Sequence, residues 1–156
     1  MLAAHATRLD MTFRFRLAAI LRFRQSVEHS EEAALYRIVQ EIAVAELDLQ
    51  RVETRQDRLR AQREQDLTRK LPAVHLLEIA ERELDLKNTA DGLRLRLLQL
   101  ETQRLRQMAI YQAARQERQI LSELHERQRH AHQLEQRRQE QKMLDDLFLA
   151  RGKASE

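Results

Sequence analysis

Lys70-Leu71-Pro72-Ala73 is the stretch that decides how this chain folds. Pro72 is the only proline among 156 residues. Proline removes a backbone donor, clashes with the preceding helical turn and pushes the residue before it out of the helical region. One helix is therefore expected to end at this stretch. A second helix is expected to begin there, because proline is well tolerated in a first helical turn.

The composition on both sides of Pro72 is typical of long helices. Charged residues make up 34% of the chain and aromatic residues 4%, and there are only two glycines. This profile predicts an all-α fold in which two long helices form an antiparallel, stalk-like coiled-coil hairpin. We expect a single hairpin over residues 11–151, with helices over about residues 12–70 and 74–150 and a bend at 71–73. Residues 1–10 are expected to be a disordered leader or to precede a start at Met11, and 152–156 a disordered tail.

A 4-3 spacing of apolar residues marks the expected contact face of each helix, because it keeps one side toward a partner. In the first helix this seam comprises Leu17, Leu21, Leu35, Ile38, Ile42, Ala45, Leu49, Val52 and Leu59. In the second it comprises Leu76, Ile79, Leu86, Ala90, Leu93, Leu97, Leu100, Tyr111, Ala114 and Leu121. Polar Arg24, Glu28 and Glu31 interrupt the first seam and should weaken it there. A hairpin turning at Pro72 places Leu35 opposite Met108.

Several functional classes have no visible site in this sequence. The chain has no cysteine, no glycine-rich phosphate loop and no nucleophile elbow, so neither an enzyme nor a cofactor is expected. The histidines at 125, 130 and 132 lack the i, i+4 spacing of a helical metal site, so we expect solvated side chains and no metal. No run reaches the roughly 20 apolar residues of a membrane span, and no signal peptide is visible, which indicates a soluble cytoplasmic protein.

The first candidate binding stretch opens the expected hairpin. Three of the four phenylalanines fall within residues 13–23, interleaved with arginines and without an acidic residue. Aromatic and arginine side chains often anchor protein interfaces, but Phe13 and Leu17 would also simply close the open end of the hairpin. The candidate residues are Phe13, Arg14, Phe15, Arg16, Leu17, Leu21 and Arg24.

The second candidate stretch closes the chain and is acidic and apolar. It overhangs the expected start of the first helix, so little would bury its apolar side chains, and exposed apolar surface indicates docking. Its candidate residues are Lys142, Leu144, Asp145, Leu147 and Phe148. A further contact surface is expected just after the bend, where one partner helix cannot cover all the apolar residues; ordinary core packing is the alternative there.

Both end stretches resemble the flagellar export protein family FliJ. The first runs Phe13-Arg14-Phe15-Arg16-Leu17-Ala18-Ala19-Ile20-Leu21-Arg22-Phe23-Arg24 and is followed by Glu28 and Glu31-Glu32-Ala33-Ala34-Leu35. The second, Glu140-Gln141-Lys142-Met143-Leu144-Asp145-Asp146, is similar to the family's C-terminal pattern Glu-x-Lys-x-Leu/Met-Asp-Asp/Glu. The similarity covers residues 11–151, and its specificity lies at these two ends.

The resemblance implies a component of the flagellar type III export apparatus, similar in shape to the gamma stalk of rotary ATPases. It implies that the joined helix ends insert into the hexameric export ATPase FliI and that a surface near the bend contacts the membrane gate protein FlhA. The resemblance places the gate surface at Leu76, Ala80 and Leu84. It also implies peripheral association with the inner face of the cell membrane and transient contact with export chaperones.

Two alternatives remain at this point. One is the corresponding stalk of a virulence type III secretion system. The other is a nucleic-acid-binding coiled coil that uses the arginine-rich ends. The net charge of +3 arises from 28 basic and 25 acidic residues, and charges balanced in this way favour a protein partner over nucleic acid.

Overall fold

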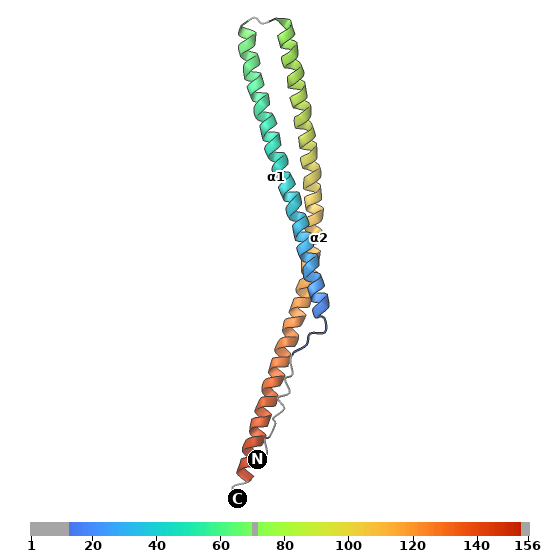
Figure 1. Ribbon diagram of the computed structural model, residues 1–156, viewed down its shortest axis with the longest axis vertical. Coiled ribbons are helices and arrows are strands. Elements are labelled where there is room, and N and C mark those ends of the chain that lie inside the picture. Colours follow the sequence, from blue (N-terminus) through green and yellow to red (C-terminus); the bar gives the residue numbers. More distant parts are fainter. Residues whose placement is uncertain (1–12, 70–71, 154–156) are drawn as a thin grey trace, which may run out of the picture. The chain divides into compact units, whose positions relative to one another are not determined.

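The computed structural model of the protein describes residues 13–69 and 72–153. This part of the chain contains two helices, α1 (Ala18–Thr68) and α2 (Ala73–Lys153), and no strand. The two helices run antiparallel on either side of the bend (Figure 1) and contact each other, which confirms the predicted all-α hairpin. The predicted leader, residues 1–10, lies outside the described residues.

The chain divides into two compact units. The bend unit comprises residues 28–114, and the end unit comprises Met1–Val27 with Arg115–Glu156. Both helices are continuous across the boundary between the units. Each unit therefore contains a segment of α1 and a segment of α2.

The bend unit is held together by a seam that is one side chain deep. Its best-packed part joins Ile42 and Ala45 of α1 to Leu100 of α2, with Ile38 and Leu97 packed against them. Leu100 is only 1% exposed. Every apolar position of the predicted seam in this unit is buried or half-buried, so the 4-3 spacing identified the contact face correctly.

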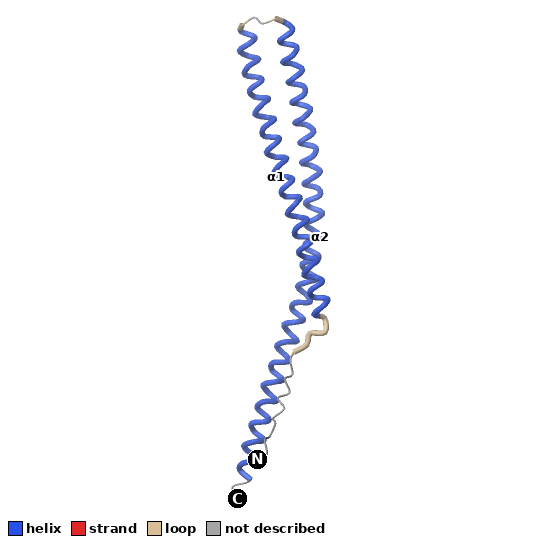
Figure 2. The backbone as a smooth tube through the Cα atoms, in the orientation of Figure 1, coloured by secondary structure: helices blue, strands red, loops and turns tan. Residues whose placement is uncertain are grey.

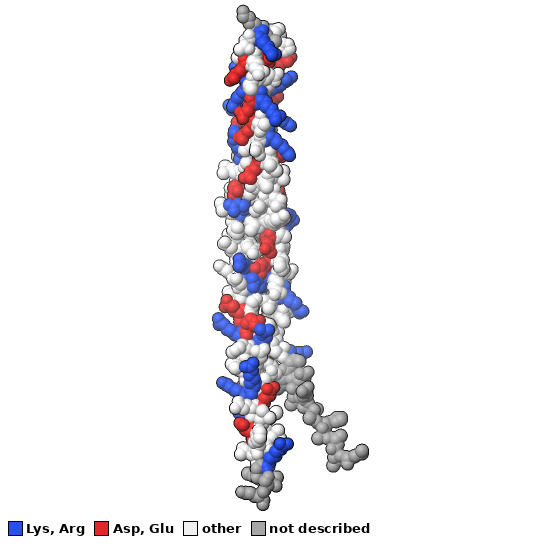
Figure 3. Space-filling model, turned by 90° about the vertical axis from the view of Figure 1, so that its left-hand side faces the viewer, with Lys and Arg blue, Asp and Glu red and all other residues white. Residues whose placement is uncertain are grey.

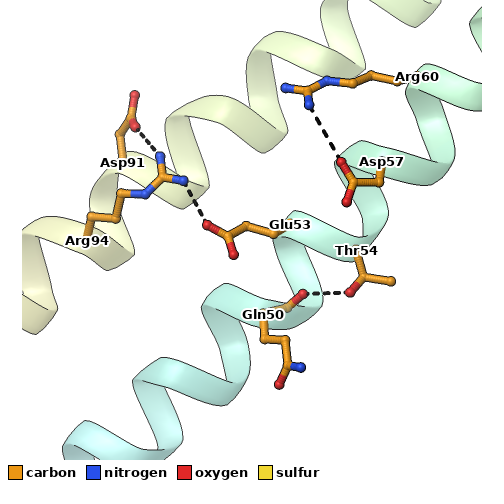
Figure 4. Close-up of polar contacts among 7 residues, drawn as sticks. All are labelled: Gln50, Glu53, Thr54, Asp57, Arg60, Asp91 and Arg94. Carbon is orange, nitrogen blue, oxygen red and sulfur yellow. Dashed lines mark hydrogen bonds and ion pairs between the residues drawn. The ribbon is translucent and has the colours of Figure 1, made fainter.

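Ion pairs line both edges of this seam. On one edge Arg96 Nη2 lies 2.9 Å from Glu41 Oε2. On the other, Arg94 donates to Glu53 at 2.8 Å and to Asp91 at 3.0 Å (Figure 4). The hydrogen bonds to Glu53 and then Asp91 raise the pKa of Arg94 above its ordinary value. Such exposed pairs add little stability, but they fix which residues of the two helices lie opposite each other.

The polar interruptions of the seam are paired across the two helices. Gln107 donates to the carboxylate of Glu31 at 2.6 Å, and Arg63 lies 3.0 Å from Glu83. Between Val52 and the bend no described residue of α1 is buried, and Ile79 is the only buried described residue of α2 before Ala90. The seam is therefore thin toward the bend.

The helix boundaries differ from the predicted ones in detail. α1 begins at Ala18 instead of about residue 12, because residues 13–15 have no regular secondary structure and residues 16–17 form a turn. Phe13 and Phe15 both contact His125 of α2, whereas helical spacing would direct them to different sides. α2 ends at Lys153 instead of about residue 150, so it includes the first part of the predicted tail.

The bend follows the expected proline chemistry. α1 ends at Thr68, and Arg69 N donates to Asp66 O at 3.1 Å in a tight closing turn. At the start of α2, His75 N donates to Pro72 O at 3.0 Å. Proline thus stands just before the first helical residue, where its missing donor is not needed.

The surface is strongly charged but mixed. In the view of Figure 3, acidic and basic side chains alternate along the described surface, and white patches separate them. Neither α1 nor α2 is long and apolar enough to cross a membrane over its described residues.

Leu100→Ala should lower the free energy of unfolding by about 2–4 kcal/mol, because it leaves a cavity in the best-packed part of the seam. The measurement is urea denaturation followed by circular dichroism. Leu98→Ala is the matched control, because Leu98 is the same residue type in the same helix but 66% exposed. Equal losses for the two variants would show that the seam does not run through Leu100.

Candidate partner-binding site

The first candidate stretch packs against α2 within the end unit. The loop before α1 runs beside α2 (Figure 2), and the Phe15 ring lies 4.9 Å from the His125 ring in an edge-on arrangement. Phe13 lies between two histidines, with its ring centroid 5.6 Å from those of His125 and His132. Phe15 is only 9% exposed. These two phenylalanines therefore close the end of the hairpin and leave little surface for a partner.

The alternation of side chains explains this packing. Phe13, Phe15 and Leu17 are buried or half-buried, whereas Arg14 and Arg16 are exposed. The apolar residues thus face α2 and the arginines face outward. The prediction that Phe13 and Leu17 close the open end is consistent with this burial.

Two histidines extend the seam where apolar residues run out. His125 and His132 are seven residues apart and so share a face of α2, and they continue the spacing that includes Leu121. The prediction of solvated side chains is wrong for both, because they contact phenylalanine rings and are half-buried. The heptad spacing alone could have placed both histidines in the seam. They were missed because histidine is usually counted as a polar residue. Within residues 13–69 and 72–153, no cluster of histidine and acidic side chains could hold a metal ion.

The aromatic side chain of α1 in this unit is exposed. Phe23 is 61% exposed and Ile20 48% exposed, and the Arg24 guanidinium lies 5.9 Å from the Phe23 ring centroid. Arg24 also forms an ion pair with Glu117 of α2, whereas Leu21 is half-buried. Phe23 lies in the predicted stretch, but it was not among the candidate site residues. Its exposure makes it a candidate aromatic contact of the end unit.

The second candidate stretch forms an exposed apolar stripe on the last turns of α2. Leu144, Leu147 and Phe148 have the i, i+3, i+4 spacing of one helical face and are 55%, 60% and 72% exposed. Met143 and Asp145 border the stripe, and both are exposed. Lys142, Asp146 and Leu149 are also exposed and lie on the opposite face of the helix. A stripe of this kind inside a strongly charged helix is typical of a docking surface.

The structure does not bring the two candidate stretches into direct contact. Phe13 and Phe15 contact α2 at His125 and His132, and Lys142 lies ten residues further along α2, about 15 Å at the rise of a helix. Both stretches nevertheless belong to the same compact unit. That unit therefore carries an exposed apolar stripe together with exposed Phe23.

The candidate surface near the bend belongs to the other unit. Ala80 and Leu84 line a shallow groove of about 330 Å³ with Gln56, Arg60, Glu83 and Lys87. Leu84 is 57% exposed, whereas Leu76 is half-buried beside Ile79 in the seam. The structure thus brings Ala80 and Leu84 together and leaves Leu76 mainly with a packing role.

The chain is similar to a known protein family. The family model described as "Flagellar FliJ protein" matches residues 13–154, which include both end stretches and the bend. No curated protein and no solved structure matches the chain.

Phe15→Ala should destabilise the end unit by about 2 kcal/mol, because it removes a nearly buried ring from the contact with His125. Amide hydrogen exchange in residues 13–27 and 115–132 should become faster. Phe23→Ala is the matched control and should leave that exchange unchanged, since its ring is mostly exposed. Unchanged exchange in the Phe15 variant would mean that the loop does not pack on α2.

Proposed function

The chain belongs to the flagellar FliJ protein family, and we propose that this flagellar export-related protein acts as a central stalk of the export apparatus. In this role its end unit inserts into the hexameric ring of the export ATPase FliI. A surface near the bend meets the export gate protein FlhA. These contacts hold the protein peripherally at the inner face of the cell membrane. The role requires no catalytic site.

The single observation that carries the proposal is the exposed surface of the end unit. The apolar stripe formed by Leu144, Leu147 and Phe148 has no partner in the described chain that covers it. Exposed Phe23 and Arg22 add the aromatic and arginine side chains that dominate binding energy in many interfaces. A protein that presents such a surface needs a complementary, largely apolar partner, and the interior of a ring is one.

The same observation divides the predicted contact residues into two groups. Phe13, Phe15 and Leu17 pack within the protein, so their proposed role is to fix the end of the hairpin. Arg14 and Arg16 point outward from that segment and are proposed to contact the ring. The proposed contacts of α2 are Lys142, Leu144, Asp145, Leu147 and Phe148.

Helix continuity gives the proposed stalk a physical means of coupling. Both α1 and α2 pass from the end unit into the bend unit without interruption. A displacement of the end unit by the ring would act on α2, which carries Ala80 and Leu84, and on α1, which packs against it. Coupling of two sites through packed helices requires no active site.

Paired variants test the ring and gate contacts in one experiment. Leu147→Ala with Phe148→Ala should weaken binding to purified FliI about tenfold or more and remove its stimulation of ATP hydrolysis, because two exposed anchors are lost. FlhA binding should persist. Leu84→Glu should show the reverse pattern, because it puts a charge into the groove near the bend. Binding assays and ATPase rates measure both.

The matched control is Leu98→Ala with Leu105→Ala, which removes two leucines of similar exposure, 66% and 62%, from the bend unit. It should alter neither interaction. If the control reduces ATPase stimulation as strongly as the end-unit variant, the proposed ring contact is wrong. Salt-sensitive DNA binding without any effect on ATP hydrolysis would instead support the nucleic-acid alternative.

A further inference from the structure

On one edge of the bend unit, two residues of like charge face each other across the helices. Other facing residues of the two helices form pairs of opposite charge. Arg96 and Glu41 form an ion pair at 2.9 Å. Moving two heptads toward the bend along both helices leads from Glu41 to Arg55 and from Arg96 to Arg82. Equivalent positions of an antiparallel coiled coil face each other, so this register puts Arg55 opposite Arg82.

The local surface agrees with that register. Arg55 of α1 and Arg82 of α2 line the same open groove, of about 370 Å³, on the edge that carries the Glu41–Arg96 pair. Both arginines are exposed, and neither forms a hydrogen bond or ion pair with any described residue. Like charges in facing positions repel each other and lower stability.

The rest of the groove adds a third unpaired arginine and an apolar floor. Arg58 lines it and likewise lacks an ion-pair partner among the described residues. Asp85 is its only carboxylate, so three arginines face one acid. Leu59 and Leu86, half-buried residues of the seam, form the apolar part of the lining. A neighbouring groove on α1 carries Arg55 and Arg58 on its border, which extends the basic surface.

We propose that this groove, here named the arginine groove (Arg55, Arg58, Leu59, Arg82 and Leu86), docks an acidic amphipathic helix of a partner protein. Leu59 and Leu86 lie between the arginines of α1 and the arginine of α2. This arrangement fits a third helix whose apolar face packs on the seam. Its flanking carboxylates pair with Arg55 and Arg82 and relieve their repulsion. The apolar floor favours such a helix over nucleic acid, which would expose those leucines to phosphates. The site is separate from the proposed ring and gate surfaces and does not depend on them.

A synthetic peptide serves as the probe. It contains three heptads with leucine at positions a and d and glutamate at e and g, which repel each other and keep the peptide monomeric. Fluorescence anisotropy measures its binding to the full chain. Arg55→Glu with Arg82→Glu should weaken binding about tenfold or more, since two ion pairs become repulsive. The same peptide with glutamine in place of glutamate should bind the native chain correspondingly weakly.

The matched control is Arg37→Glu with Arg106→Glu. These two arginines of the bend unit are also exposed and unpaired among the described residues, and the change in net charge is the same. Binding that stays within about twofold of the native chain supports the arginine groove, because long-range charge effects alone are small at physiological salt. An equal loss in both double variants overturns the proposal.

Three further outcomes also decide the matter. Arg82→Glu alone should raise the melting temperature by about 1–3 °C, because a repulsive pair becomes attractive; an unchanged or lower melting temperature contradicts the facing geometry.

Duplex DNA that displaces the peptide through the same arginines would make nucleic acid the occupant. Self-association that sedimentation shows to be lost in the double variant would make it a second copy of the chain. Either of these last two results overturns the proposal.

Discussion

The structure depends on one constraint: two helices must bury a seam that is one side chain deep, with no third layer to cover it. Leu100 reaches 1% exposure only because Ile42 and Ala45 of the other helix lie against it. Each helix alone would expose this stripe to water, so stability comes from the pairing and little from intrinsic helix propensity. Because the chain turns at its one proline, the partner helix belongs to the same chain and is present at high effective concentration.

The same constraint explains what is left on the surface. A two-helix seam can bury only one narrow stripe of each helix, so other apolar residues remain exposed. Leu98 and Leu105 in the bend unit and Leu147 and Phe148 in the end unit are examples. The end stripe has the spacing of a helical contact face, and it lies in a chain whose family works in flagellar export. The apolar side chains that the seam leaves exposed are therefore candidates for contact with partner proteins.

The end unit shows how a seam can continue without aliphatic residues. His125 and His132 occupy seam positions: His125 packs edge-on against the rings of Phe13 and Phe15, and His132 lies tilted against the ring of Phe13. An edge-on contact between aromatic rings is favourable beyond the area it buries. Before α1, residues 13–15 have no regular secondary structure, and the rings of Phe13 and Phe15 both contact His125 of α2.

Much of the fold could be predicted from local pattern. The proline at 72 and the 4-3 spacing through Ile42 and Leu100 depend only on nearby residues, and both located their elements correctly. The start of α1 was misplaced because Phe13 and Phe15 contact His125 of α2 instead of continuing the helix. Such a contact joins residues that are far apart in the sequence, so the local pattern does not reveal it. The arrangement of the candidate site was harder to predict than the fold. The burial of Phe15 and the exposure of Phe23 depend on where His125 lies in the folded chain.

The most direct test of the account is a thiol crosslink across the seam edge. The chain has no cysteine, so Glu41→Cys with Arg96→Cys introduces a single possible pair, at two positions whose native side chains meet across the seam with their charged atoms 2.9 Å apart. Because cysteine side chains are much shorter than the native ones, a flexible bismaleimide linker joins the two thiols. After reaction with the linker, denaturing electrophoresis should show a monomer of altered mobility at every protein concentration. A covalent dimer that increases with concentration would show that the seam joins two chains, and the intramolecular hairpin would be contradicted.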